Sequence, residues 1–118
     1  MTDLDPRVRR RLADLLDHTQ LAASLVARGP IAYNTDVMLR LASESLLIRM
    51  GETVDRIDKA DPLFVNQHPD LELRRLKDTR NLVAHGYDIV DYEIIWTILE
   101  TNIPAVASKV EELLNQSD

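Results

Sequence analysis

The apolar residues of this sequence recur at helical spacing along almost its whole length. Three glycines and five prolines interrupt the 118 residues, and most of them fall between the periodic segments. Apolar residues three and four apart form one face of an α-helix, and no stretch of convincing length shows the period of two that strands require. The sequence therefore predicts an all-α bundle of four to five helices, folded as a single domain over residues 1–118.

The first helix is bounded by residues that start and stop helices. Asp5 followed by Pro6 predicts its beginning, because Asp is a good cap and Pro loses nothing in the first turn. Gly29-Pro30 predicts its end. Its core face should be the row Val8, Leu12, Leu15, Ala22 and Leu25.

The second helix should run from about Asn34-Thr35 to Asp58, and it carries two faces. The first is an apolar core stripe of Leu39, Leu46, Met50, Val54 and Ile57. The second mixes apolar and acidic residues: Val37, Leu41, Glu44, Ile48, Glu52 and Asp55. Two interpretations are open: this second face meets another chain, or it lies in a larger bundle interior with its acids in solvent.

The rest of the chain predicts a third and a fourth helix. A connector from Lys59 to His68 has room for one short helical turn, Pro69 should open the third helix, and Gly86 should end it. Asp91 should cap the fourth helix, with Ile94, Ile95, Ile98 and Leu99 inward. Pro104 removes a backbone hydrogen bond, so we expect a kink or break between Thr101 and Pro104. Beyond it the core residues should be Val106, Val110, Leu113 and Leu114.

Composition excludes several kinds of function. Without cysteine there can be no disulfide, zinc-thiolate site, iron-sulfur cluster or thiol nucleophile. A net charge of -6 disfavours general binding of polyanions, so any contact with RNA should be made at a local basic site. No apolar run approaches the roughly 20 residues of a membrane span, and the first residues carry acid where a signal peptide carries base. We expect a cytoplasmic protein without membrane contact.

Arg80 interrupts the apolar row of the third helix. Leu73, Leu76, Val83 and Ala84 define that row, and Arg80 falls in the middle of it. A guanidinium facing the core is costly unless it is paired or opens onto a pocket. Glu44 and Glu52 on the second helix are the candidate partners, in a pair that is either functional or purely architectural.

Three further polar residues follow Arg80 closely. Asn81 and His85 are four apart and share a helix face, and Tyr87 lies in the loop that leaves the helix after Gly86. A lone histidine at a helix end is most often structural. Arg, Asn, His and Tyr within eight residues, one of them breaking an apolar stripe, favour a functional site.

The stretch Arg80-Asn81-Leu82-Val83-Ala84-His85-Gly86-Tyr87 resembles the R-N-x-x-x-H-x-Y signature of the HepT-like ribonuclease toxins, members of the HEPN superfamily. Flanking segments resemble the family in the same order: Arg49-Met50-Gly51-Glu52-Thr53 upstream, then Val90-Asp91-Tyr92-Glu93-Ile94-Ile95-Trp96 and Asn102-Ile103-Pro104 downstream. Met50 and Thr53 depart from the family pattern conservatively, and Asn102 replaces a frequent Asp.

This resemblance implies a HEPN-type up-and-down bundle that cleaves RNA, single-stranded RNA or tRNA, without metal or cofactor. The implied site is shared by two subunits of a homodimer, with Arg80 and His85 catalytic and Asn81 supporting. It also implies a minimal nucleotidyltransferase antitoxin as partner, which attaches AMP to Tyr87. The alternative is a non-catalytic helical adaptor that binds a nucleotidyltransferase or a nucleotide.

Other charged residues are weaker candidates. Arg74, Arg75 and Lys77 precede the motif on the same helix and are placed to extend an RNA track. Asp14 and His18 are four apart, but two ligands make a poor metal site and we expect none there. A basic cluster opens the first helix, and it either guides a partner or is simply solvated: Arg7, Arg9, Arg10 and Arg11.

Overall fold

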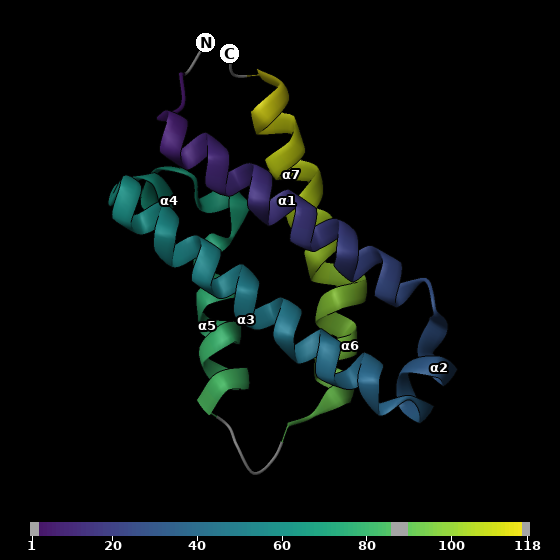
Figure 1. The fold of residues 1–118 in the computed structure, drawn as a ribbon. Coiled ribbons are helices and arrows are strands. Elements are labelled where there is room, and N and C mark those ends of the chain that lie inside the picture. The colour runs from purple at the N-terminus through teal and green to yellow at the C-terminus, as the bar shows by residue number, and fades with distance from the viewer. Residues whose placement is uncertain (1–2, 86–89, 117–118) are drawn as a thin grey trace.

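The computed structural model describes residues 3–85 and 90–116, and this part of the chain is a bundle of helices (Figure 1). The predicted all-α class is confirmed, since the described residues contain no strand. Helix α3 (Val37–Ala60) is central and packs against both α1 (Pro6–Val26) and α5 (Leu73–His85). None of the helices in the described ranges is long and apolar enough to cross a membrane.

Helix α1 forms as its sequence predicts. The Asp5 carboxylate accepts a hydrogen bond from the Arg7 backbone N–H at 2.8 Å, and Pro6 occupies the first turn. The cap therefore satisfies one of the N–H groups that a helix start leaves without a partner. The whole predicted row is buried: Val8, Leu12, Leu15, Ala22 and Leu25.

Helix α1 ends just before Gly29-Pro30, as predicted, but these two residues also begin a short helix that was not predicted, α2 (Gly29–Thr35). Gly29 has a φ of +89°, which turns the chain, and Pro30 then suits the first turn of the new helix. As a result α3 begins at Val37, after the expected start. Its cap is Asp36, which accepts from the Met38 N–H at 2.9 Å.

An aromatic cluster anchors α2 to its neighbours. The side chain of Tyr33 is buried, and its hydroxyl lies 3.0 Å from the Ser43 Oγ of α3. Its ring is 5.0 Å from that of Trp96, a half-buried residue of α6 (Tyr92–Thr97). The Tyr33 ring also packs at a steep angle, 71°, against the ring of Tyr92, the first residue of α6.

The third predicted helix is also corrected at its start. Pro69 opens only the 3₁₀ turn η1 (Pro69–Leu71), and the chain breaks at Glu72, whose φ of 54° lies in the left-handed region. Helix α5 then begins at Leu73. The short turn expected in the connector is present as α4 (Phe64–Gln67), whereas Gly86, the predicted stop, lies outside the described residues.

The last helical rod, residues 92–116, is divided near Pro104, where the sequence predicts a kink or break. A π-helical segment, η2 (Ile98–Asn102), joins α6 to α7 (Ile103–Gln116). Asp91 caps α6 as expected, accepting from the N–H groups of Glu93 at 3.0 Å and Ile94 at 3.3 Å. Figure 1 shows α7 crossing α1, while α6 lies against α3.

The inward residues of this rod are mostly as predicted. Ile95 and Leu99 are buried, and so are Val106 and Val110 beyond the break. Ile94 is an exception, with 52% of its surface exposed. Ile94 lies about 100° round the helix from Ile95, and it faces a pocket between α5 and α6 in place of the core.

Candidate active site

Arg80 lies where α5 passes very close to α3 at Gly51. A Cβ atom at Gly51 would collide with the Cβ and Cγ of Arg80 and would stand 3.1 Å from the Leu76 carbonyl oxygen. Gly51 therefore permits a contact between the two helix backbones that no other residue allows without a shift. This contact fixes the height along α3 at which the Arg80 side chain leaves α5.

The Arg80 side chain is 20% exposed and is held at two of its three nitrogens. Its Nη2 donates to the Asp55 Oδ2 at 2.7 Å, and its Nε donates to the Asn81 Oδ1 at 2.8 Å. Within the described ranges, Nη1 has no hydrogen-bond partner. The guanidinium is thus oriented by one contact from α3 and one from α5, and it keeps donors that an anionic ligand can use.

The predicted partners of Arg80, Glu44 and Glu52, are wrong. Glu52 is exposed, and Glu44 accepts a hydrogen bond from the Tyr92 hydroxyl at 2.6 Å. The partner is Asp55, one turn beyond Gly51 on the same side of α3. All three acids share a helix face, so their angular position did not distinguish them, and the crossing at Gly51 selects Asp55.

Lys77 extends this pair into a cluster of four charges. Its Nζ lies 2.7 Å from the Asp58 Oδ2 and 3.2 Å from the Asp55 Oδ1. Burial raises the pKa of Asp55, but hydrogen bonds from Arg80 and Lys77 outweigh it and leave that pKa below its usual value. The hydrogen bond to Asp58 raises the pKa of Lys77. Two carboxylates therefore balance the two cations.

The other residues of the predicted RNA track are not part of this cluster. Arg74 donates to the Asn66 Oδ1 at 2.6 Å, and Arg75 pairs with Glu72 at 3.3 Å. Both arginines are exposed near the start of α5. The structure therefore brings Lys77 next to Arg80 and leaves Arg74 and Arg75 on the surface beyond it.

The structure describes only part of the second half of the R-N-x-x-x-H-x-Y signature. Asn81 is exposed on α5, and His85 is the last residue of that helix, one turn further on. The His85 side chain and the whole of Tyr87 lie outside the described residues. The backbone therefore places the histidine position at the end of the helix whose middle carries Arg80.

The chain on the other side of residues 86–89 is also tied to α3. The Tyr92 hydroxyl donates to Glu44, and this hydrogen bond raises the pKa of Tyr92. The Arg40 guanidinium lies 5.7 Å from the centre of the Tyr92 ring and donates to the carbonyl oxygens of Tyr33 and Asn34. Glu44, predicted to support the site as a partner of Arg80, instead holds the start of α6.

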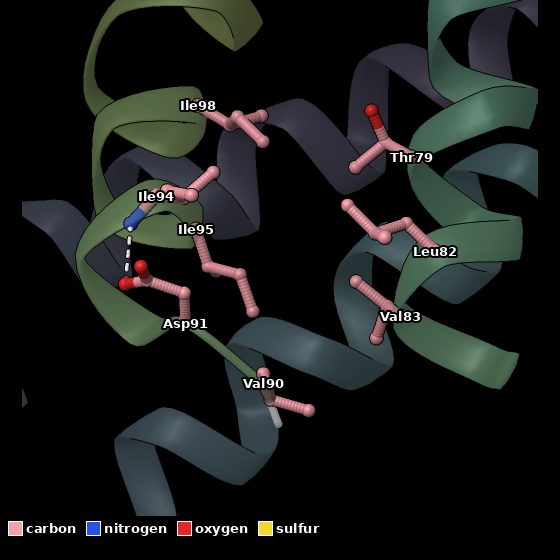
Figure 2. Close-up of a pocket in the computed structure, with 8 residues that line it drawn as sticks. All are labelled: Thr79, Leu82, Val83, Val90, Asp91, Ile94, Ile95 and Ile98. Carbon is pink, nitrogen blue, oxygen red and sulfur yellow. Dashed lines mark hydrogen bonds between the residues drawn. The ribbon is translucent and has the colours of Figure 1, made fainter. Parts of the chain in front are cut away.

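A small apolar pocket lies between α5 and α6, with a volume of about 160 Å³ (Figure 2). Figure 2 shows Thr79, Leu82 and Val83 on one wall and residues of α6 on the other. Thr79 and Leu82 leave α5 on a different side from Arg80, which points toward α3, whereas Val83 belongs to the row that Arg80 interrupts. The pocket lining is Thr79, Leu82, Val83, Val90, Asp91, Ile94, Ile95 and Ile98.

The N-terminal half of the mixed face of α3 is not covered by α5. Val37 and Leu41 are 53% and 52% exposed, and Met38 beside them is also exposed. The next turns border a shallow depression lined by Leu41, Glu44, Ser45, Ile48, Arg49 and Glu52. An apolar surface of this kind, rimmed by charges, is typical of a protein interface.

Two other predicted features fall outside the site. The Arg7 guanidinium is bound to Asp5 and to the Ala60 carbonyl oxygen, so this member of the basic cluster joins α1 to the end of α3. Asp14 pairs with Arg11 at 3.3 Å. Within residues 3–85 and 90–116, no three His, Asp or Glu side chains are grouped as a metal site would require.

Comparison with known proteins agrees with this architecture. The family model for HepT-like ribonucleases matches residues 15–113. The chain therefore belongs to the HepT-like ribonuclease family. No solved structure gives a significant match.

Two curated relatives are similar at modest identity. A Methanocaldococcus jannaschii protein that carries the name of an RNase is 28% identical over 65 residues, which are 55% of this chain and 51% of that protein. A Thermococcus cleftensis protein that carries the name ribonuclease HepT is 27% identical over 79 residues, 66% of this chain and 72% of its own length. The chain thus spans about half the length of the first relative.

Proposed function

We propose that this protein is a toxin endoribonuclease that cleaves RNA by attack of a ribose 2'-hydroxyl on the adjacent phosphate. The observation that carries this proposal is the anchored Arg80 guanidinium, whose Nη1 has no partner among residues 3–84 and 90–116, on the same helix as His85. Membership of the HepT-like ribonuclease family supports the same reaction class.

In the proposed reaction the 2'-oxygen forms a new bond to phosphorus while the bond from phosphorus to the 5'-oxygen breaks. A base removes the 2'-hydroxyl proton, and an acid gives a proton to the leaving 5'-oxygen. The products are a 2',3'-cyclic phosphate and a 5'-hydroxyl. Imidazole suits both proton transfers at neutral pH, and the guanidinium of Arg80 stabilises the charge that grows on the phosphate oxygens.

A homodimer would supply two histidines to such a site, one as acid and one as base. The exposed apolar residues on α3, namely Val37, Met38 and Leu41, support an interface on that helix. In a two-fold dimer the same patch faces itself, which suits a self-complementary apolar surface. A heterodimer with His85→Ala in one subunit should then lose most of its activity, and full activity would contradict the division of labour.

RNA would approach along the exposed surface at the start of α5. Arg74 and Arg75 lie there, although Arg75 is partly neutralised by Glu72. Because the chain carries a net charge of -6, binding should depend on this local surface and weaken steeply with salt.

Control of the toxin would come from a minimal nucleotidyltransferase that adenylylates Tyr87. A bulky anionic group two residues from His85 would repel the phosphate and block the approach of RNA. Mass spectrometry after incubation with such a partner and ATP should detect one added AMP, which Tyr87→Phe should abolish. An unchanged modification of Tyr87→Phe would contradict this assignment.

The central test uses the purified protein, single-stranded RNA and a chelator. The wild type should cleave and leave 2',3'-cyclic phosphate ends, and His85→Ala should not, with unchanged helicity by circular dichroism. If neither protein cleaves while both still bind a nucleotidyltransferase, the protein is a non-catalytic adaptor.

A further inference from the structure

We propose that Asp55 is a positioning residue of the active site: it holds the Arg80 guanidinium so that the Nη1 edge is presented to the scissile phosphate. This inference rests on the proposed ribonuclease function. Neither the motif nor its flanking segments include Asp55, whose contacts with α5 distinguish it from the other acids of α3.

The pairing geometry argues against a purely architectural ion pair. Arg and carboxylate usually form their strongest pairs in a bidentate fork, with two parallel hydrogen bonds. Here the two oxygens of the Asp55 carboxylate have different partners. Oδ2 accepts a hydrogen bond from the Arg80 Nη2 at 2.7 Å, and Oδ1 lies 3.2 Å from the Lys77 Nζ. The carboxylate therefore binds one side of the guanidinium and does not consume the other.

The second anchor acts at Nε, which lies on the same edge of the guanidinium as Nη2. Asn81 accepts from the Arg80 Nε at 2.8 Å, so the plane of the guanidinium is fixed by one contact from α3 and one from α5 itself. A free arginine side chain loses about 2 kcal/mol of rotamer entropy when it is immobilised. Anchoring before RNA arrives removes most of that cost from the binding and reaction steps.

Lys77 and Asp58 keep Asp55 itself in place. Lys77 bridges the two acids from the turn of α5 that precedes Arg80, and Asp58 holds it at 2.7 Å. The cluster is neutral before RNA binds, with two acids and two bases, so α3 and α5 can meet there without repulsion. A phosphate then meets an arginine whose direction is set by its neighbours.

This role predicts a loss of turnover more than a loss of binding. The charge on the phosphate oxygens grows in the transition state, and a misdirected guanidinium stabilises that charge less well. Asp55→Asn should therefore lower kcat by about 10- to 100-fold, the effect expected of a misplacement near 1 Å, and should change KM by less than about threefold. Asp55→Glu should recover part of the loss, because it restores the charge.

Asp14→Asn is the matched control. It is the same chemical change, and it also removes the acidic partner of an arginine, but that pair is the one with Arg11 on α1, outside the candidate site. Its kcat should stay within about twofold of wild type. Circular dichroism and thermal melts of each variant at the assay temperature establish that the compared proteins are folded.

A double variant tests whether Asp55 acts through Arg80. If it does, adding Asp55→Asn to Arg80→Ala should cause no further loss of kcat, because the positioned group is already absent. Additive losses would overturn the proposal and assign Asp55 a separate structural role. An Asp55→Asn protein as active as wild type, or more active, would also overturn it; higher activity would mean that Asp55 competes with phosphate for Arg80.

These experiments also distinguish a failure of the Asp55 proposal from a failure of the proposed ribonuclease function. A folded wild-type protein that does not cleave RNA would overturn both. An active wild type that loses cleavage in His85→Ala but not in Asp55→Asn would uphold the ribonuclease and reject the positioning role alone.

Discussion

Gly51 and Arg80 lie at a close approach between α3 and α5, where the hydrogen atom of glycine leaves space for the Cβ and Cγ of the arginine. This relationship sets the position of every residue further along α5, including the helix end at His85. The candidate active site is therefore sensitive to the spacing of two helix backbones.

Gly51→Ala should damage both stability and activity. In an ordinary helix interior this change stabilises by about 0.5–1 kcal/mol, but overpacking against Arg80 costs about 1–3 kcal/mol, so we expect a net loss of about 1–2 kcal/mol. Urea denaturation measures it, with Glu52→Ala, the exposed neighbour, as control within about 0.5 kcal/mol of wild type. A Gly51→Ala protein as stable as wild type would contradict the close contact.

The contribution of Asp55 to stability should depend on pH. Its pKa in the folded protein is lowered, because the hydrogen bonds from Arg80 and Lys77 outweigh the effect of burial. A carboxyl with a lowered folded pKa stabilises the protein above its unfolded pKa, about 3.9, and this contribution disappears as pH falls through the folded value.

The difference in unfolding free energy between wild type and Asp55→Asn should thus be largest above about pH 5 and should shrink toward about pH 3 and below. Urea titrations over this range measure the difference. Glu52→Gln, an exposed acid on the same helix, should show no such trend. A difference that stays constant with pH would show that the charge of Asp55 does not stabilise the fold.

The hydrogen bonds of Tyr33 and Ser43 should not be equally important. The Ser43 Oγ donates to the Arg40 carbonyl oxygen at 2.6 Å, so the Tyr33 hydroxyl must donate to Ser43. Burial raises the pKa of Tyr33, and the phenol keeps the proton that it donates.

Ser43→Ala leaves the buried Tyr33 hydroxyl without its acceptor and should cost about 1–3 kcal/mol, whereas Tyr33→Phe leaves Ser43 bonded to Arg40 and should cost about 1 kcal/mol. The two urea midpoints give the comparison directly. Equal losses, or a greater loss for Tyr33→Phe, would contradict the assigned direction of the hydrogen bond.

Leu41→Glu should separate the proposed dimer into monomers. A carboxylate in the middle of an apolar interface would be desolvated without a partner. Sedimentation velocity should show the monomer, and RNA cleavage should fall with it. Leu21→Glu is the control, since Leu21 is 58% exposed on α1 and Leu41 is 52% exposed on α3. If both variants behave alike, the interface lies elsewhere.

The helices were predictable because each depends on a local signal. The apolar row of α1, the caps Asp5 and Asp91, and the missing N–H of Pro104 act within one or two turns. The extra helix at Gly29 was missed because a glycine and a proline that end one helix can also begin the next.

The site was predictable in part for the same reason. The sequence shows that Arg80 breaks an apolar row, and the angle of each acid on α3 follows from its position in the helix. The height at which two helices cross does not follow from either helix alone. Asp55 was therefore indistinguishable from Glu44 and Glu52 until the contact at Gly51 was known.

The π-helical segment before Pro104 also corrects the angular register of the last rod. The buried residues Ile95, Leu99 and Ile103 follow one another at intervals of four. In a regular α-helix each such step rotates the side chain by about 40° beyond a full turn, so the row would drift away from the core. The wider turn of a π-helix reduces this drift. The π-helical segment next to Pro104 thus keeps Ile95, Leu99 and Ile103 on the inner side of the rod. Along this side α6 packs against α3, and α7 packs against α1.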